Sequence, residues 1–152
     1  MPLPNIFTQP VAEEIISRIN KLTPATPALW GKMNVSQMLA HCNVTYEMVY
    51  ETKHPEPKGL VKFMLKLFVK NLVVNEAPYK RNSRTAPAFL VTGSKEFDAE
   101  KKRLIDYITK TQQLGEHSFD NKVSLSFGPL SKTEWNNMFY KHLNHHLSQF
   151  SA

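Results

Sequence analysis

Apolar residues recur along most of the chain at spacings of three and four positions, which is the period of an α-helix rather than of a strand. Only five glycines are present, and the residues between the periodic segments read as connections, including 75–93 and 116–130. The length of 152 residues fits one domain. The pattern therefore predicts an all-α fold for a single domain over 1–152, with helices at 8–22, 34–51, 58–74, 94–114 and 131–150.

Several of these helices begin at residues whose side chains can cap them. Asn34 with Gln37, and Ser131 with Glu134, have the spacing of a capping box, in which the two side chains bond to each other's backbone N–H. Two further helix starts are predicted by single polar residues, Thr8 and Ser94.

Segment 58–74 differs from an ordinary amphipathic helix. Its lysines form one narrow row at four-residue spacing, and nearly every other position is apolar; they are Lys58, Lys62, Lys66 and Lys70. A helix with so narrow a polar face must be covered on most sides, by the core, by a second subunit or by lipid. We favour packing against the core or in a homodimer, and a membrane-surface helix is the alternative.

Composition and charge narrow the class of protein. Apolar residues make up 41% and charged residues 21% of the chain, as in ordinary globular proteins. The net charge is +6, and the stretch 53–110 alone carries +7. Such a stretch can be a solvated surface, or it can face an anionic small molecule or nucleic acid. Because no nucleic-acid-binding motif accompanies the charge, we expect no nucleic acid partner.

Several function classes are excluded. A single cysteine, Cys42, rules out a disulfide framework and a multi-cysteine zinc site. The chain has no apolar run long enough to cross a membrane, and its first residues do not resemble a signal peptide, so we expect a cytoplasmic protein. It contains no HExxH motif, nucleotide-binding loop or Ser-His-Asp order.

The last predicted helix carries two histidines inside its apolar arc. His142 and His146 are one turn apart, so both rings point to the same side. Buried imidazole nitrogens need partners, and one divalent metal ion satisfies both rings at once. His41 lies beside the apolar stripe of helix 34–51 and is the best candidate for a third ligand. The alternative is that each histidine is satisfied separately within the core.

Two other residues of this helix lie near the histidine pair. His145 falls at the edge of the apolar arc and is expected at the rim of the site. Gln149 lies about one turn beyond His146 and can orient a ligand histidine or a bound water, or it is an ordinary polar residue at a helix end.

Three segments together resemble the DinB-like (DinB/YfiT) superfamily, and most closely a branch of it catalogued only as a domain of unknown function. They are GKMNVSQMLAHC (31–42), TAPAFL (85–90) and YKHLNHHLSQF (140–150). The resemblance implies a four-helix bundle of 8–22, 34–51, 94–114 and 131–150, with 58–74 as an additional helical segment. It also implies a metal held by His41, His142 and His146. The Arg-Gly pair that many relatives carry after the last histidine is replaced here by Leu147 and Ser148.

Characterised relatives in that superfamily include transferases and isomerases that use bacillithiol, mycothiol or glutathione-like thiols. Three neutral histidines would leave a divalent ion, zinc or nickel first and iron or manganese next, with open positions for a thiol or for water. We therefore expect a metal-dependent enzyme that transfers a thiol to an electrophilic small-molecule substrate, with a low-molecular-weight thiol as cosubstrate. Such thiols are anionic and would be attracted by Lys80, Arg81 and Arg84.

Two other functions remain open from the sequence. In the first, the protein is a non-enzymatic binding protein with a vestigial metal site, and segment 58–74 makes a dimer or membrane contact. The second is metal-assisted hydrolysis, which needs a general base. The motif helices offer no obvious carboxylate for that role, because Glu47 and Glu51 lie too far along their helix from His41.

Overall fold

The computed structural model describes residues 1–152 and is mostly helical, which confirms the all-α prediction apart from one small hairpin. Its long helices are α1 (Gln9–Asn20), α2 (Val35–Tyr50), α5 (Phe97–Leu114) and α6 (Lys132–Gln149). The shorter elements are α3 (Gly59–Met64), a π-helical turn (Leu65–Val69), α4 (Lys70–Val74), 3-10 turns at Pro87–Phe89 and Glu116–Phe119, and strands β1 (Lys122–Ser124) and β2 (Gly128–Leu130).

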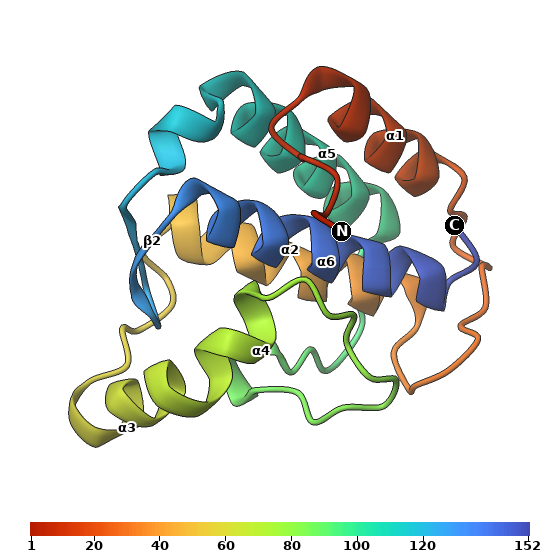
Figure 1. Ribbon diagram of the computed structural model, residues 1–152. Coiled ribbons are helices and arrows are strands. Elements are labelled where there is room, and N and C mark those ends of the chain that lie inside the picture. Colours follow the sequence, from red (N-terminus) through yellow and green to blue (C-terminus); the bar gives the residue numbers. More distant parts are fainter.

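The four long helices pack side by side around one core (Figure 1). In this view α6 crosses in front of α2, and α5 and α1 lie above them. Aromatic rings fill much of the space between the helices, as where Tyr46 of α2 stacks on Phe139 of α6 with ring centroids 4.9 Å apart. This tight packing holds α2 and α6, the two helices that carry the inward histidines, at fixed positions.

The helix starts are confirmed in part. Both capping boxes are present, at Asn34 and at Ser131. Thr8 stands at the N-cap of α1, but its hydroxyl donates to the Asn5 carbonyl instead of accepting from the helix. The prediction for Ser94 is wrong: α5 begins at Phe97, whose side chain is buried in the core, and the preceding backbone is extended.

Residues 116–130 are not a plain loop, as the sequence had indicated. They contain a 3-10 turn and an antiparallel hairpin in which Lys122 pairs with Leu130. Tertiary contacts stabilise this hairpin, since Leu130 is fully buried and the Trp135 indole donates to the Lys122 carbonyl at 3.2 Å. Strands of three residues are too short to produce a recognisable alternation of apolar and polar positions.

Segment 58–74, which we call the arm, is helical from Gly59 to Val74, with the π-helical turn between its two α-helical parts. Its end is tied to α6, because the Lys141 ammonium donates to the carbonyls of Leu72 and Asn75 at 2.8 and 2.7 Å, and the Asn137 amide donates to the Val74 carbonyl at 2.9 Å. Its beginning projects away from the bundle, at the lower left of Figure 1.

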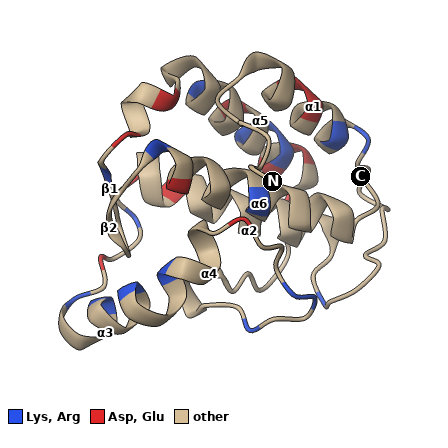
Figure 2. Cartoon of the chain, viewed as in Figure 1, with Lys and Arg blue, Asp and Glu red and all other residues tan.

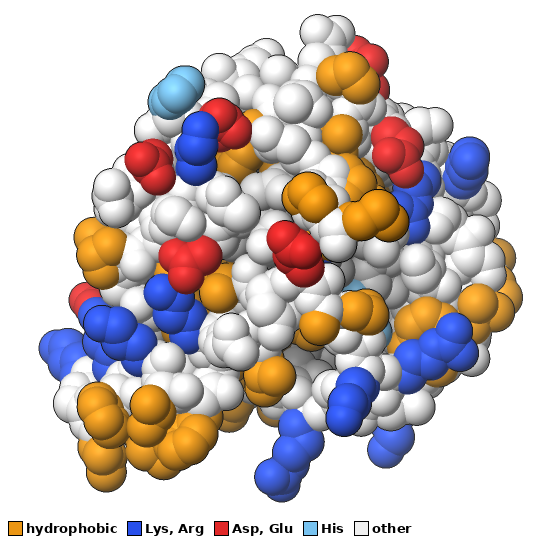
Figure 3. All heavy atoms as spheres, viewed as in Figure 1, with side chains coloured by type: hydrophobic (Ala, Val, Ile, Leu, Met, Phe, Trp, Pro, Cys, Tyr) orange, Lys and Arg blue, Asp and Glu red, His pale blue; other side chains and the backbone are white.

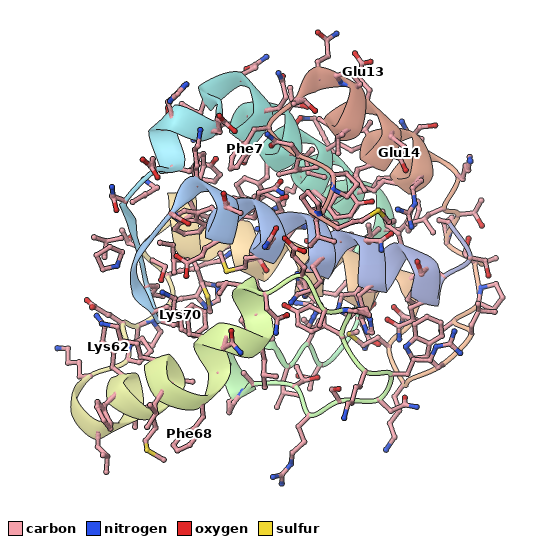
Figure 4. All side chains as sticks on the ribbon, viewed as in Figure 1. Phe7, Glu13, Glu14, Lys62, Phe68 and Lys70 are labelled. Atoms are coloured by element: carbon pink, nitrogen blue, oxygen red, sulfur yellow. The ribbon has the colours of Figure 1, made fainter.

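The arm has three faces, and the core covers only part of it. An inner row at four-residue spacing faces a large cleft: Val61, Leu65, Val69 and Val73. In the lysine row, Lys62 and Lys70 are partly buried and pair with Glu56 and Glu134 (Figure 4), whereas Lys58 and Lys66 are exposed. The outer face stays exposed and forms an apolar cluster at the lower left of Figure 3: Leu60, Phe63, Met64, Leu67, Phe68 and Leu72.

The core therefore leaves the outer face of the arm uncovered, contrary to the expectation of core packing. Neither the arm nor any other helix has the length and apolar character needed to cross a membrane.

Candidate metal centre

The three predicted ligand histidines converge on one point between α2 and α6. His41 projects from α2, and His142 and His146 project from successive turns of α6. One ring nitrogen of each lies within 4.8 Å of the corresponding nitrogen of the others, an arrangement that can hold a metal ion. The Nε2 atoms of His41 and His142 are 3.0 Å apart.

The Nδ1 atom of each of the three rings makes a hydrogen bond with an oxygen of the protein. The Nδ1 of His41 donates to the Phe89 carbonyl at 2.8 Å, and the Nδ1 of His146 donates to the Gln149 side-chain oxygen at 2.8 Å. Carbonyl oxygens only accept, so both rings carry their proton on Nδ1 and present a lone pair at Nε2. The Nδ1 of His142 bonds to the Thr45 hydroxyl at 3.1 Å, which can donate or accept.

Gln149 is itself held in place. Its amide nitrogen donates to the Trp30 carbonyl at 2.7 Å, which fixes the side-chain oxygen toward His146. Gly31 makes room for this contact, because a Cβ at that position would lie 2.6 Å from the Gln149 amide nitrogen. Gly31 also has φ +83°, a backbone conformation that favours glycine. Of the two sequence readings of Gln149, the contacts support the one in which it orients a histidine.

Burial keeps the three rings neutral. It lowers the pKa of His41 and His146, the latter to about 3, and lowers that of His142 well below its ordinary value, with neighbouring histidines adding to the effect. Neutral imidazoles are the form that binds metal ions, because the lone pair at Nε2 is free.

The three ring nitrogens that face one another are better suited to binding a metal ion than to hydrogen-bonding among themselves. His41 and His146 both present lone pairs, and the one mobile proton that can sit between rings is that of His142, which faces His41. The Nε2 of His146 accepts no hydrogen bond from the protein, and His146 lines a large cleft. A divalent ion would satisfy all three nitrogens at once, with Thr45 then accepting from His142.

His145 and the basic residues lie around this centre, as the sequence had indicated. The ring of His145 packs edge-on against Trp30, Tyr79 and the ligand histidine His146, and it is not part of the ligand set. Burial lowers the pKa of His145, and the charge of Arg81 lowers it further. The Arg81 guanidinium stacks over Trp30 at 4.2 Å from the ring centre.

A cleft of about 1120 Å³ opens onto the three histidines and extends to the inner row of the arm. Its charged lining residues are Lys32, Lys80 and Arg84, and no aspartate or glutamate lines it. Figure 2 shows the same imbalance, with basic segments along the loops below the bundle. Two of the three predicted basic residues, Lys80 and Arg84, therefore line the cleft, and the third, Arg81, stacks on Trp30, which also lines it.

Glu47 is turned away from the metal centre, as its position along α2 predicted. Its carboxylate pairs with Lys53 at 2.7 Å, His54 at 2.7 Å and Arg103. These residues line a separate cavity of about 310 Å³.

Two groups that hold the histidines in place were missed by the sequence reasoning. Thr45 lies one turn after His41 on the same face of α2, and this i, i+4 spacing was a usable signal. Phe89 acts through its backbone carbonyl, so no side-chain pattern could indicate it, although it lies in the segment 85–90 that carried the resemblance.

Comparison with known proteins gives a family but no activity. Neither the curated proteins nor the solved structures yielded a match. Residues 4–152 match a family described as a protein of unknown function (DUF1569), which agrees with the resemblance to a domain of unknown function. Since the match spans nearly the whole chain, the protein belongs to the DUF1569 family.

Proposed function

We propose that this protein is a metal-dependent enzyme in which His41, His142 and His146 hold a divalent ion. The observation that carries the proposal is the convergence of three neutral imidazoles, each with its other nitrogen bonded to a protein oxygen. Bonds of this kind to the second nitrogen orient metal-binding histidines and raise their basicity. Zinc or nickel is the first choice of metal, and iron or manganese the next, because imidazole suits all four.

We further propose that the protein is a DinB-like bundle. The order of its elements supports this, since α1, α2, α5 and α6 pack together and the arm is inserted between α2 and α5. The positions of the three histidines, one on the second bundle helix and two on the last, support it as well.

The reaction that we propose is transfer of a low-molecular-weight thiol to an electrophilic small molecule. A bound divalent ion would lower the pKa of such a thiol and hold it as thiolate. The thiol would release its proton to solvent, its sulfur would bond to the electrophilic carbon, and the leaving group would depart with the electrons of its own bond. The thiol must come from a cosubstrate, because the only cysteine of the chain, Cys42, is buried and burial raises its pKa.

The chain's own groups would bind and orient the cosubstrate. Lys80 and Arg84 line the cleft and would attract an anionic thiol, while Arg81 fixes Trp30 at the rim. Hydrolysis is less well supported, because it needs a general base and no carboxylate lines the cleft. We expect the activity in the cytoplasm, where a free cysteine is stable, and we expect no nucleic acid partner.

The decisive experiment is elemental analysis of tag-free protein purified without chelator. We expect about one equivalent of a divalent metal in the wild type, and a large loss in each of His41→Ala, His142→Ala and His146→Ala. His117→Ala, outside the cluster, is the matched control and should keep the metal. A screen for thiol consumption with electrophilic substrates then follows. Protein that takes up none of zinc, nickel, manganese or iron would refute the metal site.

A second candidate function rests on the exposed outer face of the arm. Six large apolar side chains on one short segment lie in solvent there, among them Phe68 with 60% of its surface exposed. We propose that this face makes the dimer or membrane contact of a binding protein whose metal site is vestigial. Sedimentation and flotation with acidic liposomes separate the two contacts, and a monomer that ignores liposomes would exclude both.

A further inference from the structure

The large cleft has a polar end and an apolar end. The polar end contains the three histidines and Tyr79, and the other end contains the inner row of the arm. Opposite that row, Met48 and Val49 of α2 and Met138 of α6 complete an apolar wall. The volume of about 1120 Å³ is at the upper end of what small-molecule sites enclose, so the cleft can take a ligand much larger than a thiol.

Three of the four residues of the inner row are half-buried, whereas Val61 at its start is 62% exposed. From Val61 to Val73 the row spans about 18 Å at the helical rise per residue. Leu65, Val69 and Val73 are half-buried: they touch the edge of the core and still line open space. The π-helical turn begins at Leu65 and ends at Val69, and such turns occur frequently at functional sites.

The inner row suits an apolar part of a ligand, and the charged residues that line the cleft indicate what its polar part is. Lys32, Lys80 and Arg84 line the cleft without a single carboxylate, so it favours an anion. The cations come from the loops near the histidines, and the inner row of the arm contributes none to the cleft.

We propose that the cleft binds a long-chain carboxylate, with its alkyl chain along the inner row of the arm and its carboxylate toward Lys80 and Arg84. If the proposed enzyme acts on such a ligand, the carboxylate serves as the binding group and the electrophilic carbon with its leaving group lies elsewhere on the same molecule; in that respect the inference rests on the proposed function. The binding itself requires only the walls of the cleft.

The test uses the full chain and a fluorescent C18 carboxylate, cis-parinaric acid, displaced by hexanoate, decanoate, tetradecanoate and tetradecanol below their aggregation limits. We expect a saturable site and up to about fourfold tighter binding for each added CH₂ that enters the cleft. Tetradecanol should bind more weakly than tetradecanoate in the wild type, and about as well as it in the double variant Lys80→Gln/Arg84→Gln. Affinity that does not depend on chain length would overturn the proposal.

Matched variants on the two faces of the arm locate the alkyl chain. Leu65→Asn and Val69→Asn place an amide in the inner row and should weaken binding at least about tenfold. Leu67→Asn and Phe68→Asn make comparable changes on the outer face and should leave binding unchanged. Circular dichroism checks that each variant is folded, and Val69→Trp, which fills the cleft while staying apolar, provides a second blocking variant. Equal losses on both faces would refute the assignment to the cleft.

The same titration on chelator-treated protein and on His142→Ala separates this inference from the proposed function. We expect the carboxylate to bind both, because the inner row is intact in each. Protein that binds metal but no carboxylate would overturn this inference alone. Carboxylate binding by a protein that takes up no metal would support it and leave only the proposed enzyme refuted.

Discussion

The helix α6 and the arm carry the same kind of sequence pattern and lie in opposite surroundings. Both place apolar residues at helical spacing with polar residues one turn apart. On α6, Phe139 and Leu143 are 1% exposed, whereas Leu67 and Phe68 of the arm are 58% and 60% exposed. Periodicity thus identifies which residues share a face, but the presence of a packing partner decides whether that face is buried.

The polar residues within the two patterns also differ in what they contact. The inward histidines of α6 meet His41 across the bundle and form a site. Two of the four lysines of the arm pair with carboxylates of the same chain, Lys62 with Glu56 and Lys70 with Glu134. A polar row inside an apolar helix therefore indicates a specific partner in both cases, and the residue type indicates which chemistry that partner has.

The largest expected effect contrasts one phenylalanine from each region. Phe139→Ala removes a ring that packs against Tyr46, Phe119 and Trp135, and should lower the free energy of unfolding by about 3–5 kcal/mol. Phe68→Ala should change it by less than about 0.5 kcal/mol, because the ring is already in water. Urea unfolding of both variants measures the difference. Similar losses in the two would mean that the outer face is covered in solution.

The features that could be predicted from the sequence are those set by local spacing, and the features that could not are those set by packing partners. The bundle helices, both capping boxes and the pair of His142 and His146 could be predicted because local spacing determines them, whereas His41 was indicated by its place beside a second apolar stripe and by the family resemblance. The hairpin at 122–130 and the start of α5 could not, since the burial of Leu130 and Phe97 depends on contacts far away in sequence. The same holds for the Phe89 carbonyl, and for the single cleft that joins the histidines to the arm.

The next largest effect concerns the connection between the bundle and the arm. Glu47 of α2 binds Arg103 of α5. It also binds Lys53 and His54, which lie in the segment that connects α2 to the arm. Glu47→Gln should lower the free energy of unfolding by about 1.5–3 kcal/mol near neutral pH, because hydrogen bonds to charged groups are lost. Glu13→Gln, on the exposed side of α1, is the control and should have little effect.

The pH dependence of that loss has a definite sign. Burial raises the pKa of Glu47, but hydrogen bonds from Lys53, His54 and Arg103 outweigh it and hold the pKa below its ordinary value of 4.5. The carboxylate therefore contributes stability above pH 4.5 that is lost as the pH falls through the lowered pKa. The gap between the wild type and Glu47→Gln should shrink in acid. A gap that widens would contradict the assignment.

A smaller effect tests the hydrogen bonds behind the histidines. Gln149→Ala should weaken metal binding by about 10- to 100-fold, because His146 loses the oxygen that orients it. Gln149→Glu keeps an acceptor for His146 and should retain more affinity, although it loses the bond to Trp30. Competition with a chromogenic chelator measures the affinities, with the exposed neighbour Ser148→Ala as control. Unchanged affinity in Gln149→Ala would assign Gln149 to the helix end alone.

The smallest effect tests how firmly the arm is held. The pair between Lys70 and Glu134 is partly exposed on both sides, so Lys70→Gln should lower the free energy of unfolding by less than about 1 kcal/mol. Its effect should be local, because Lys141 and Asn137 still hold the last turn of α4. Hydrogen exchange should accelerate in the arm and stay unchanged in α6, where the packed core limits opening.

High salt should mimic the substitution in the wild type and add little to the variant, since salt screens the same pair. Faster exchange that spreads into α6 would mean that the arm and the bundle open as one unit. The arm and the bundle would then differ in exposure but not in stability. The inner row could not move to admit a ligand without also loosening α6, the helix that carries His142 and His146.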